Sequence, residues 1–212
     1  PALYALCLTA DRGRQFRVVF LALLVSAPPL LSYLNLTIVR SGVTFGFSGV
    51  LMAYFGYLPL ALAEHAQSRL GLGRSTVVAP LLFFAGLALV TIQLLRAVLA
   101  NPVTVAVNGV PASVTWVLVA TLAEVVVLLV LVLVFYSTSM TGGPAHLRTS
   151  LRRAFDRKGH FELAVVALVL FVTIPFLTFP ADPIAGGRVF NLYVHFVGYA
   201  LGFIATYVYH TL

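Results

Sequence analysis

The chain has 212 residues, of which 61% are hydrophobic and 9% are charged, and its formal net charge is +7. An average soluble domain carries about 25% charged residues, so this composition excludes that class and indicates a polytopic membrane protein. Because the positive charge is concentrated in short arginine-rich segments, we attribute it to membrane topology and lipid headgroups and expect no nucleic-acid partner.

Apolar runs of about 20 residues predict the membrane spans, because a helix rises about 1.5 Å per residue and must cross about 30 Å of hydrocarbon. Residues 1–9 are too short to cross, and we expect them to be the tail of a truncated helix. Prolines 59, 175 and 180 are expected to interrupt or end helices. The predicted fold is all-α, a polytopic transmembrane helical bundle that forms a single domain over residues 1–212. Its six predicted spans are 18–39, 43–63, 76–98, 113–136, 161–179 and 189–212.

The basic residues predict the orientation of these spans. If every span crosses, three basic segments fall on one side of the membrane and hold ten of the thirteen Lys and Arg residues. Cytoplasmic loops carry such an excess, so this side is predicted to be cytoplasmic and the protein to be a multi-pass cell-membrane protein. The ten residues are Arg12, Arg14, Arg17, Arg69, Arg74, Arg148, Arg152, Arg153, Arg157 and Lys158.

Two connecting segments carry weaker patterns. The basic cytoplasmic loop 137–160 holds Leu147, Leu151, Ala154 and Phe155 at helical spacing, which predicts a short helix lying on the headgroups. The segment ANPVTVAVNGVPAS, residues 100–113, alternates valines around Asn-Gly and predicts a small hairpin.

A serine and a histidine, far apart in sequence, are predicted to lie at one depth. Ser48 is about five residues into span 43–63, and His195 about six residues into span 189–212. Three intervening spans make these two helices parallel, so both side chains should lie roughly 7 to 10 Å below the outer boundary. A serine needs a neighbouring base to act as a nucleophile, and N–H donors aimed at the oxyanion that forms. Gly46 and Gly49 would give backbone access there, and the N–H of Ser48 is a candidate donor.

Small residues recur on both helices at the spacing that lets membrane helices approach closely. Close approach suits a hydrogen bond between the two side chains. The stripe on the serine helix is Gly49, Ala53 and Gly56, and the stripe on the histidine helix is Gly198, Gly202 and Ala205.

The segments GFSGVLMAYFG and HFVGYALG fit Gly-x-Ser-Gly-x-x-x-Ala-x-x-Gly and His-x-x-Gly-x-x-x-Gly, and together they resemble the serine-helix and histidine-helix signatures of the rhomboid intramembrane serine proteases. The resemblance implies a catalytic dyad open to the outer face, with Ser48 as nucleophile and His195 as general base. It further implies cleavage of transmembrane protein substrates within the lipid bilayer through an acyl-enzyme, without metal or cofactor. Ala53, Gly56, Gly198 and Gly202 would be its helix-packing positions.

The chain departs from the rhomboid pattern in two ways. The family carries His-x-x-x-Asn on an earlier helix, and residues 1–47 hold no such motif, which we attribute to N-terminal truncation. The family also has one span between serine and histidine, whereas this chain has three, so we expect a rhomboid-like bundle with two extra spans.

Other interpretations of the same residues remain open. A lone Gly-x-Ser-Gly is usually a packing motif, His195 alone could be a satisfied interior group, and Asn191 could orient the imidazole or cap its helix. A catalytically inactive rhomboid-like protein that binds membrane helices is therefore one alternative. Another is a small transporter centred on Glu124, because an acidic group within a span costs roughly 2.5 to 3.5 kcal/mol on insertion scales. We expect Glu124 to face protein and to be protonated or paired, and a proton or ion pathway through it could include Gln93 or Arg96.

Overall fold

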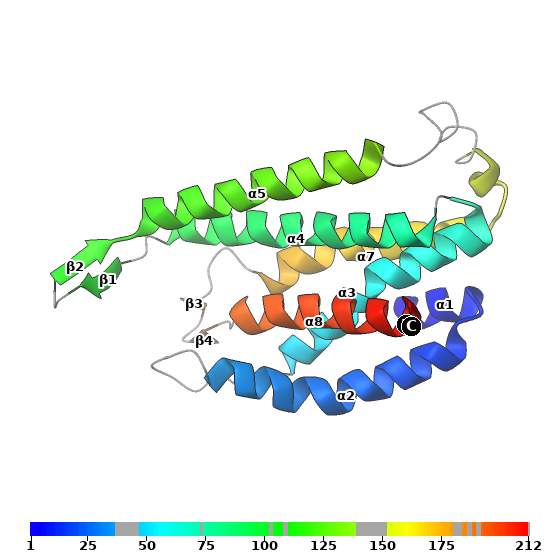
Figure 1. The fold of residues 1–212 in the computed structure, drawn as a ribbon, viewed down its shortest axis with the longest axis horizontal. Helices are drawn as coiled ribbons and strands as arrows, with labels where there is room; N and C mark the ends of the chain where they lie inside the picture. The colour runs from blue at the N-terminus through cyan, green and yellow to red at the C-terminus, as the bar shows by residue number, and fades with distance from the viewer. Residues whose placement is uncertain are drawn as a thin grey trace.

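The computed structural model consists almost entirely of helices (Figure 1). Residues 1–36, 47–72, 74–101, 104–107, 110–138, 152–179, 184–185, 188–189 and 192–211 are described. The helices are α1 (Ala2–Thr9), α2 (Gly13–Leu36), α3 (Ser48–His65), α4 (Ser75–Ala100), α5 (Thr115–Thr138), α7 (His160–Thr178) and α8 (Leu192–Thr211), and a π-helical segment (Ala66–Leu70) extends α3. Two antiparallel hairpins pair β1 (Thr104–Val107) with β2 (Val110–Ser113) and β3 (Ile184–Ala185) with β4 (Arg188–Val189).

Four of the described helices are long and apolar enough to cross a membrane, which indicates an all-helical membrane protein. They cover Gly13–Leu34, Ser75–Ala100, Thr115–Phe135 and His160–Thr178. These correspond to four of the six predicted spans. Helices α3 and α8 occupy the two remaining predicted ranges, 43–63 and 189–212, although α3 begins at Ser48 and residues 37–46 lie outside the described part of the chain.

Helix α3 is the centre of the bundle. Its side chains from Gly49 to His65 are buried except at Leu51 and Tyr54, and it packs against α1, α2, α4, α7 and α8. A helix that is apolar on all sides suits such a position. The helix continues through Pro59, and α7 likewise continues through Pro175, so the expectation that these two prolines interrupt or end their helices is wrong.

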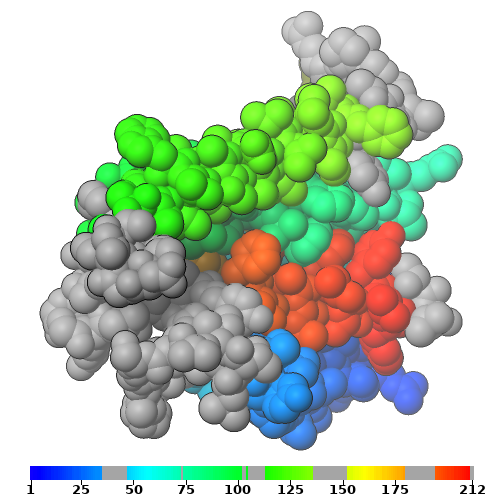
Figure 2. All heavy atoms as spheres, turned by 60° about the vertical axis from the view of Figure 1, so that its left-hand side comes forward, coloured from blue at the N-terminus to red at the C-terminus, as the bar shows by residue number. Residues whose placement is uncertain are grey.

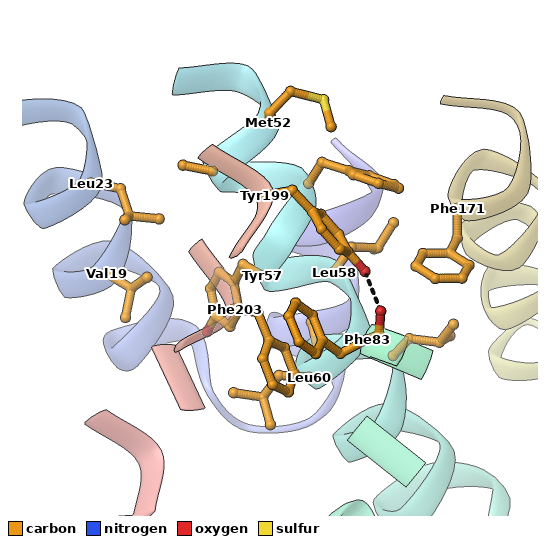
Figure 3. Close-up of a cluster of buried hydrophobic side chains, with 14 of the residues drawn as sticks. Val19, Leu23, Met52, Tyr57, Leu58, Leu60, Phe83, Phe171, Tyr199 and Phe203 are labelled. Atoms are coloured by element: carbon orange, nitrogen blue, oxygen red, sulfur yellow. Dashed lines mark hydrogen bonds between the residues drawn. The ribbon is translucent and has the colours of Figure 1, made fainter. Parts of the chain in front are cut away.

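An aromatic cluster joins α8 to α3 and α4, and α3 to α7 (Figure 3). The rings of Phe83 and Phe203 stack with centroids 4.1 Å apart, and Phe55 lies 5.6 Å from Phe171. Tyr199 is fully buried, and its hydroxyl donates to the backbone carbonyl of Phe83 at 3.1 Å. These contacts fix α8 against the neighbouring helices.

Helix α5 forms the outer edge of the molecule, on the side of α4 away from α8 and α2 (Figure 1). The hairpin predicted between α4 and α5 is confirmed, with Val107 opposite Val110. The expectation that Glu124 faces protein is wrong. Its side chain is exposed on α5, and within the described residues it makes no hydrogen bond or ion pair, because α5 packs on its neighbour with other positions. Arg96 instead donates to Gln93 Oε1 at 3.3 Å.

A polar network ties the basic segments together at one end of the bundle. Glu64 Oε1 lies 3.0 Å from His210 Nδ1 and 3.5 Å from Arg12 Nε, which joins α3 to α8 and to the turn after α1. Arg69 Nη2 lies 2.7 Å from Asp11 Oδ2, and the guanidinium of Arg157 donates to the backbone carbonyl of Arg69. Basic residues from all three predicted cytoplasmic segments therefore lie at the same end.

The structure covers the basic loop only in part. Residues 152–155 are helical, with Ala154 buried and Phe155 exposed. Leu147 and Leu151, the other two positions of the predicted amphipathic face, lie outside the described residues.

Candidate active site

Helices α3 and α8 run parallel and pack closely enough for their backbones to touch. A Cβ added at Gly198 would lie 2.2 Å from the carbonyl oxygen of Gly49, and one at Gly202 would lie 1.8 Å from that of Ala53. A Cβ at Gly56 would lie 2.1 Å from the carbonyl oxygen of Tyr199. Real Cβ atoms do not approach this closely, so these glycines permit the contact between the helices.

This packing brings Ser48 and His195 together at the end of the bundle opposite the basic network. Ser48 is the first residue of α3, and His195 lies in the first turn of α8. The Oγ atom of Ser48 is 2.7 Å from Nε2 of His195. Ser48 is partly exposed, whereas His195 is only 3% exposed. The pair is therefore a hydrogen-bonded serine and imidazole with the hydroxyl on the more accessible side.

The last turn of α7 orients the imidazole. Nδ1 of His195 lies 2.8 Å from the backbone carbonyl oxygen of Thr178, the final residue of the helix. Because a carbonyl oxygen only accepts hydrogen bonds, Nδ1 carries the proton and Nε2 of the neutral ring accepts from Ser48. Phe179 is almost fully buried, and its ring meets the imidazole nearly perpendicularly, with centroids 5.6 Å apart.

The position of Ser48 at a helix N-terminus also supplies backbone donors. The N–H groups of Val50 and Leu51 both donate to the carbonyl of Phe47 at 3.1 Å. The N–H groups of Ser48 and Gly49 precede them in the first turn, where backbone donors have no intrahelical partner and the helix dipole favours negative charge. Phe47 and Leu51, close to Ser48 in the sequence, are exposed.

The other residues predicted from the sequence differ in their burial, and some lie outside the described part of the chain. Gly49, Ala53, Gly56, Gly198 and Gly202 are buried at the contact between α3 and α8. Ala205 is exposed, so its place in the α8 stripe is a correction: Thr206 is buried in its stead, because successive residues of a helix are about 100° apart. Gly46 and Asn191 lie outside the described residues.

Sequence reasoning missed the residues that hold the imidazole. Thr178 contributes through its backbone, which leaves no signature in side-chain type. The available signal was Pro180, since a helix that ends just before a proline leaves its last carbonyls without intrahelical partners. Phe179 gave no signal beyond its apolar character.

The described residues contain no group of three or more His, Cys, Asp or Glu side chains arranged to hold a metal ion. His65 lies 2.7 Å from Thr9 Oγ1 and 3.0 Å from the carbonyl of His160, so it joins helices at the basic end.

Comparison with protein-family models, with curated proteins and with solved structures gives no match for this chain.

Proposed function

We propose that the protein is an intramembrane serine endopeptidase that cleaves transmembrane segments of other proteins through the dyad of Ser48 and His195. The observation that carries this proposal is the 2.7 Å contact between Ser48 Oγ and His195 Nε2. Its supports are the defined tautomer of the ring, the backbone donors of the first turn of α3 and the resemblance of both segments to the rhomboid signatures.

The proposed chemistry follows from the roles of these atoms. His195 Nε2 accepts the hydroxyl proton while Ser48 Oγ attacks the scissile carbonyl carbon, and the N–H groups of Ser48 and Gly49 are the candidate donors to the oxyanion. When the tetrahedral intermediate collapses, the imidazolium gives its proton to the leaving amine. Water then hydrolyses the acyl-enzyme with the same histidine as base.

The C-terminus of α7 fits the part that a carboxylate plays in a catalytic triad. Thr178 carbonyl oxygen accepts from Nδ1–H and so keeps the lone pair of Nε2 directed at Ser48. The same carbonyl lies at the negative end of the α7 dipole, which stabilises an imidazolium by about 0.3 to 2 kcal/mol. A dyad held in this way needs no third side chain.

The place of the dyad in the bundle suggests where substrates meet it. Ser48 lies at the end of α3 opposite Glu64 and the basic segments, and the positive-inside rule assigns that basic end to the cytoplasm. The dyad would then open near the outer face of the cell membrane. Its substrates would be transmembrane helices whose backbone can unwind there, because a helical peptide bond is shielded from attack.

Labelling of the full chain in detergent with a fluorophosphonate tests this proposal. Wild type should be labelled on Ser48, and Ser48→Ala should not be labelled at all. His195→Ala should slow labelling by at least about 10²-fold, the lower end of what a general base contributes. Ser26→Ala is a matched control, because this hydroxyl is exposed in α2 and donates only to the carbonyl of Ala22. Equal labelling of wild type and Ser48→Ala would refute the proposal and leave a catalytically inactive, membrane-helix-binding relative.

A further inference from the structure

Helix α5 is the least covered of the membrane-spanning helices. It lies on the surface of the molecule, packed on α4, and no residue of its most apolar stretch within Thr115–Phe135 is buried (Figure 2). The other three candidate spans each bury part of their length inside the bundle. Helix α5 therefore presents a long face to the surroundings of the protein.

That face carries one acidic group at mid-depth. Glu124 lies nine residues after Thr115 and eleven before Phe135, which places it about 14 and 16 Å from the two ends of the span. A glutamate side chain is too short to reach the headgroups from there. Any partner of the carboxyl group must therefore lie at the same depth.

The residues around Glu124 form a continuous exposed stripe at helical spacing. Val117, Leu128 and Leu131 are 67%, 61% and 59% exposed, and Thr121 is exposed one turn before Glu124. The hydroxyl of Thr121 donates to the carbonyl of Val117 at 2.9 Å, so its hydrogen-bond donor is satisfied within the helix. The stripe is thus apolar apart from the carboxyl group, with a small side chain beside it that allows another helix to approach.

A second glutamate of the same chain shows what such a group requires. Glu64, at the end of α3, is paired with His210 and Arg12. Glu124 has no such partner among the described residues. Intramembrane carboxyl groups pair with other polar groups because hydrocarbon neither stabilises a charge nor accepts a hydrogen bond. A cation at mid-depth would satisfy the carboxylate of Glu124 by charge complementarity.

We propose that the exposed face of α5 docks a transmembrane helix of another protein that carries a lysine or arginine near its midpoint, held by Glu124. A lipid headgroup lies too far away to serve, and a symmetric dimer through α5 would bring two Glu124 side chains together. A basic helix satisfies the carboxyl group and covers Val117, Leu128 and Leu131 at the same time. This surface does not depend on the activity of Ser48.

The single tryptophan of the chain, Trp116, makes docking directly measurable. It lies on α5, 76% exposed and eight residues before Glu124. The full chain is reconstituted into phosphatidylcholine vesicles and titrated with a synthetic 21-residue leucine-alanine helix that carries one central lysine and a dansyl group one turn away. Energy transfer from Trp116 to dansyl reports binding, and the same helix with leucine at the centre is the reference.

We expect the lysine helix to bind about tenfold more tightly than the leucine helix. Glu124→Leu should abolish this preference and Glu124→Gln should reduce it, whereas Asp156→Asn, which removes an exposed acid outside the spans, should leave it unchanged. Equal binding of the two helices to wild type, a comparison that needs no variant, overturns the proposal. A lysine preference that survives in Glu124→Leu also overturns it. Self-association that requires Glu124 and is not displaced by the lysine helix overturns it in favour of a second copy.

Discussion

Substitution of Gly198 by alanine tests whether the backbone contact between α3 and α8 sets the geometry of the dyad. Gly198 lies three residues after His195, about 4.5 Å along the helix axis, and faces Gly49, the residue after Ser48. A methyl group here pushes apart the two segments that carry Ser48 and His195, and it leaves Ser48, His195 and Thr178 themselves unchanged.

The size of the displacement follows from the structure. The added Cβ would lie 2.2 Å from the carbonyl oxygen of Gly49, whereas ordinary contact begins at 3.4 Å. Relief of the clash by helix separation therefore requires about 1.2 Å at this level. The distance from Ser48 Oγ to His195 Nε2 would grow from 2.7 Å to as much as about 3.9 Å, beyond hydrogen-bond range.

Gly198→Ala is expected to lower both the rate of labelling and the stability of the fold. A displacement of about 1 Å in a reacting group can cost about 10²-fold in rate, and overpacking of this kind costs about 1 to 3 kcal/mol of stability. The rate of fluorophosphonate labelling of Gly198→Ala should therefore fall by about 10²-fold at a temperature where circular dichroism shows the variant to be folded.

Gly13→Ala is the matched control, because its Cβ would meet only Leu8 Cδ1 at 3.4 Å, an ordinary contact. Its labelling rate should equal that of wild type. If folded Gly198→Ala is labelled within about twofold of the wild-type rate, the backbone contact does not set the dyad geometry and the reasoning fails.

Three further outcomes are expected. Phe179→Leu removes the edge contact to His195 at 5.6 Å while keeping an apolar side chain, so labelling should slow several-fold with a smaller change in melting temperature; unchanged labelling would show that the Thr178 carbonyl alone orients the ring. The labelling rate should fall at acid pH with the uptake of a single proton, because Nε2 of His195 must be free to accept from Ser48; a flat profile would contradict its role as base. Burial lowers the pKa of His65, which follows the predicted span 43–63, below its ordinary value of 6.5, so the unfolded chain takes up its proton first as the pH falls. The free energy of unfolding should therefore decrease below about pH 6.5, and the loss between pH 7.5 and 5.5 should be smaller in His65→Gln.

The membrane character and the hairpin were predictable because each depends on local pattern. Apolar runs of the required length identify α2, α4, α5 and α7, and the alternating valines around Asn-Gly predict the pairing of β1 with β2. Small residues at three- and four-residue spacing also identified most of the contact between α3 and α8. Ala205 was misassigned because spacing alone does not show which of two successive residues, about 100° apart, faces the contact, and here it is Thr206.

The surroundings of Glu64 and Glu124 could not be predicted from the sequence. Glu64 finds His210 and Arg12 because the ends of α3 and α8 and the turn after α1 meet, and nothing in the local sequence records this. Glu124 lies in an equally apolar segment and is exposed, because α5 meets α4 with other positions of its surface. The hydropathy of a helix gives its depth in the membrane but not its rotation about its own axis.

The arrangement of α4 and α5 explains how three helices between Ser48 and His195 in sequence leave the two in contact. Helix α4 supports α8 through Phe83, which stacks on Phe203 and accepts the hydroxyl hydrogen of Tyr199. Gly86 leaves room for that hydroxyl, which would lie 2.0 Å from an added Cβ. Helix α5 then packs outside α4 and takes no part in the contact between α3 and α8. Helices α4 and α5 thus thicken the bundle on one side, while the backbones at Gly49 and Gly198 keep the serine and the imidazole at hydrogen-bond distance.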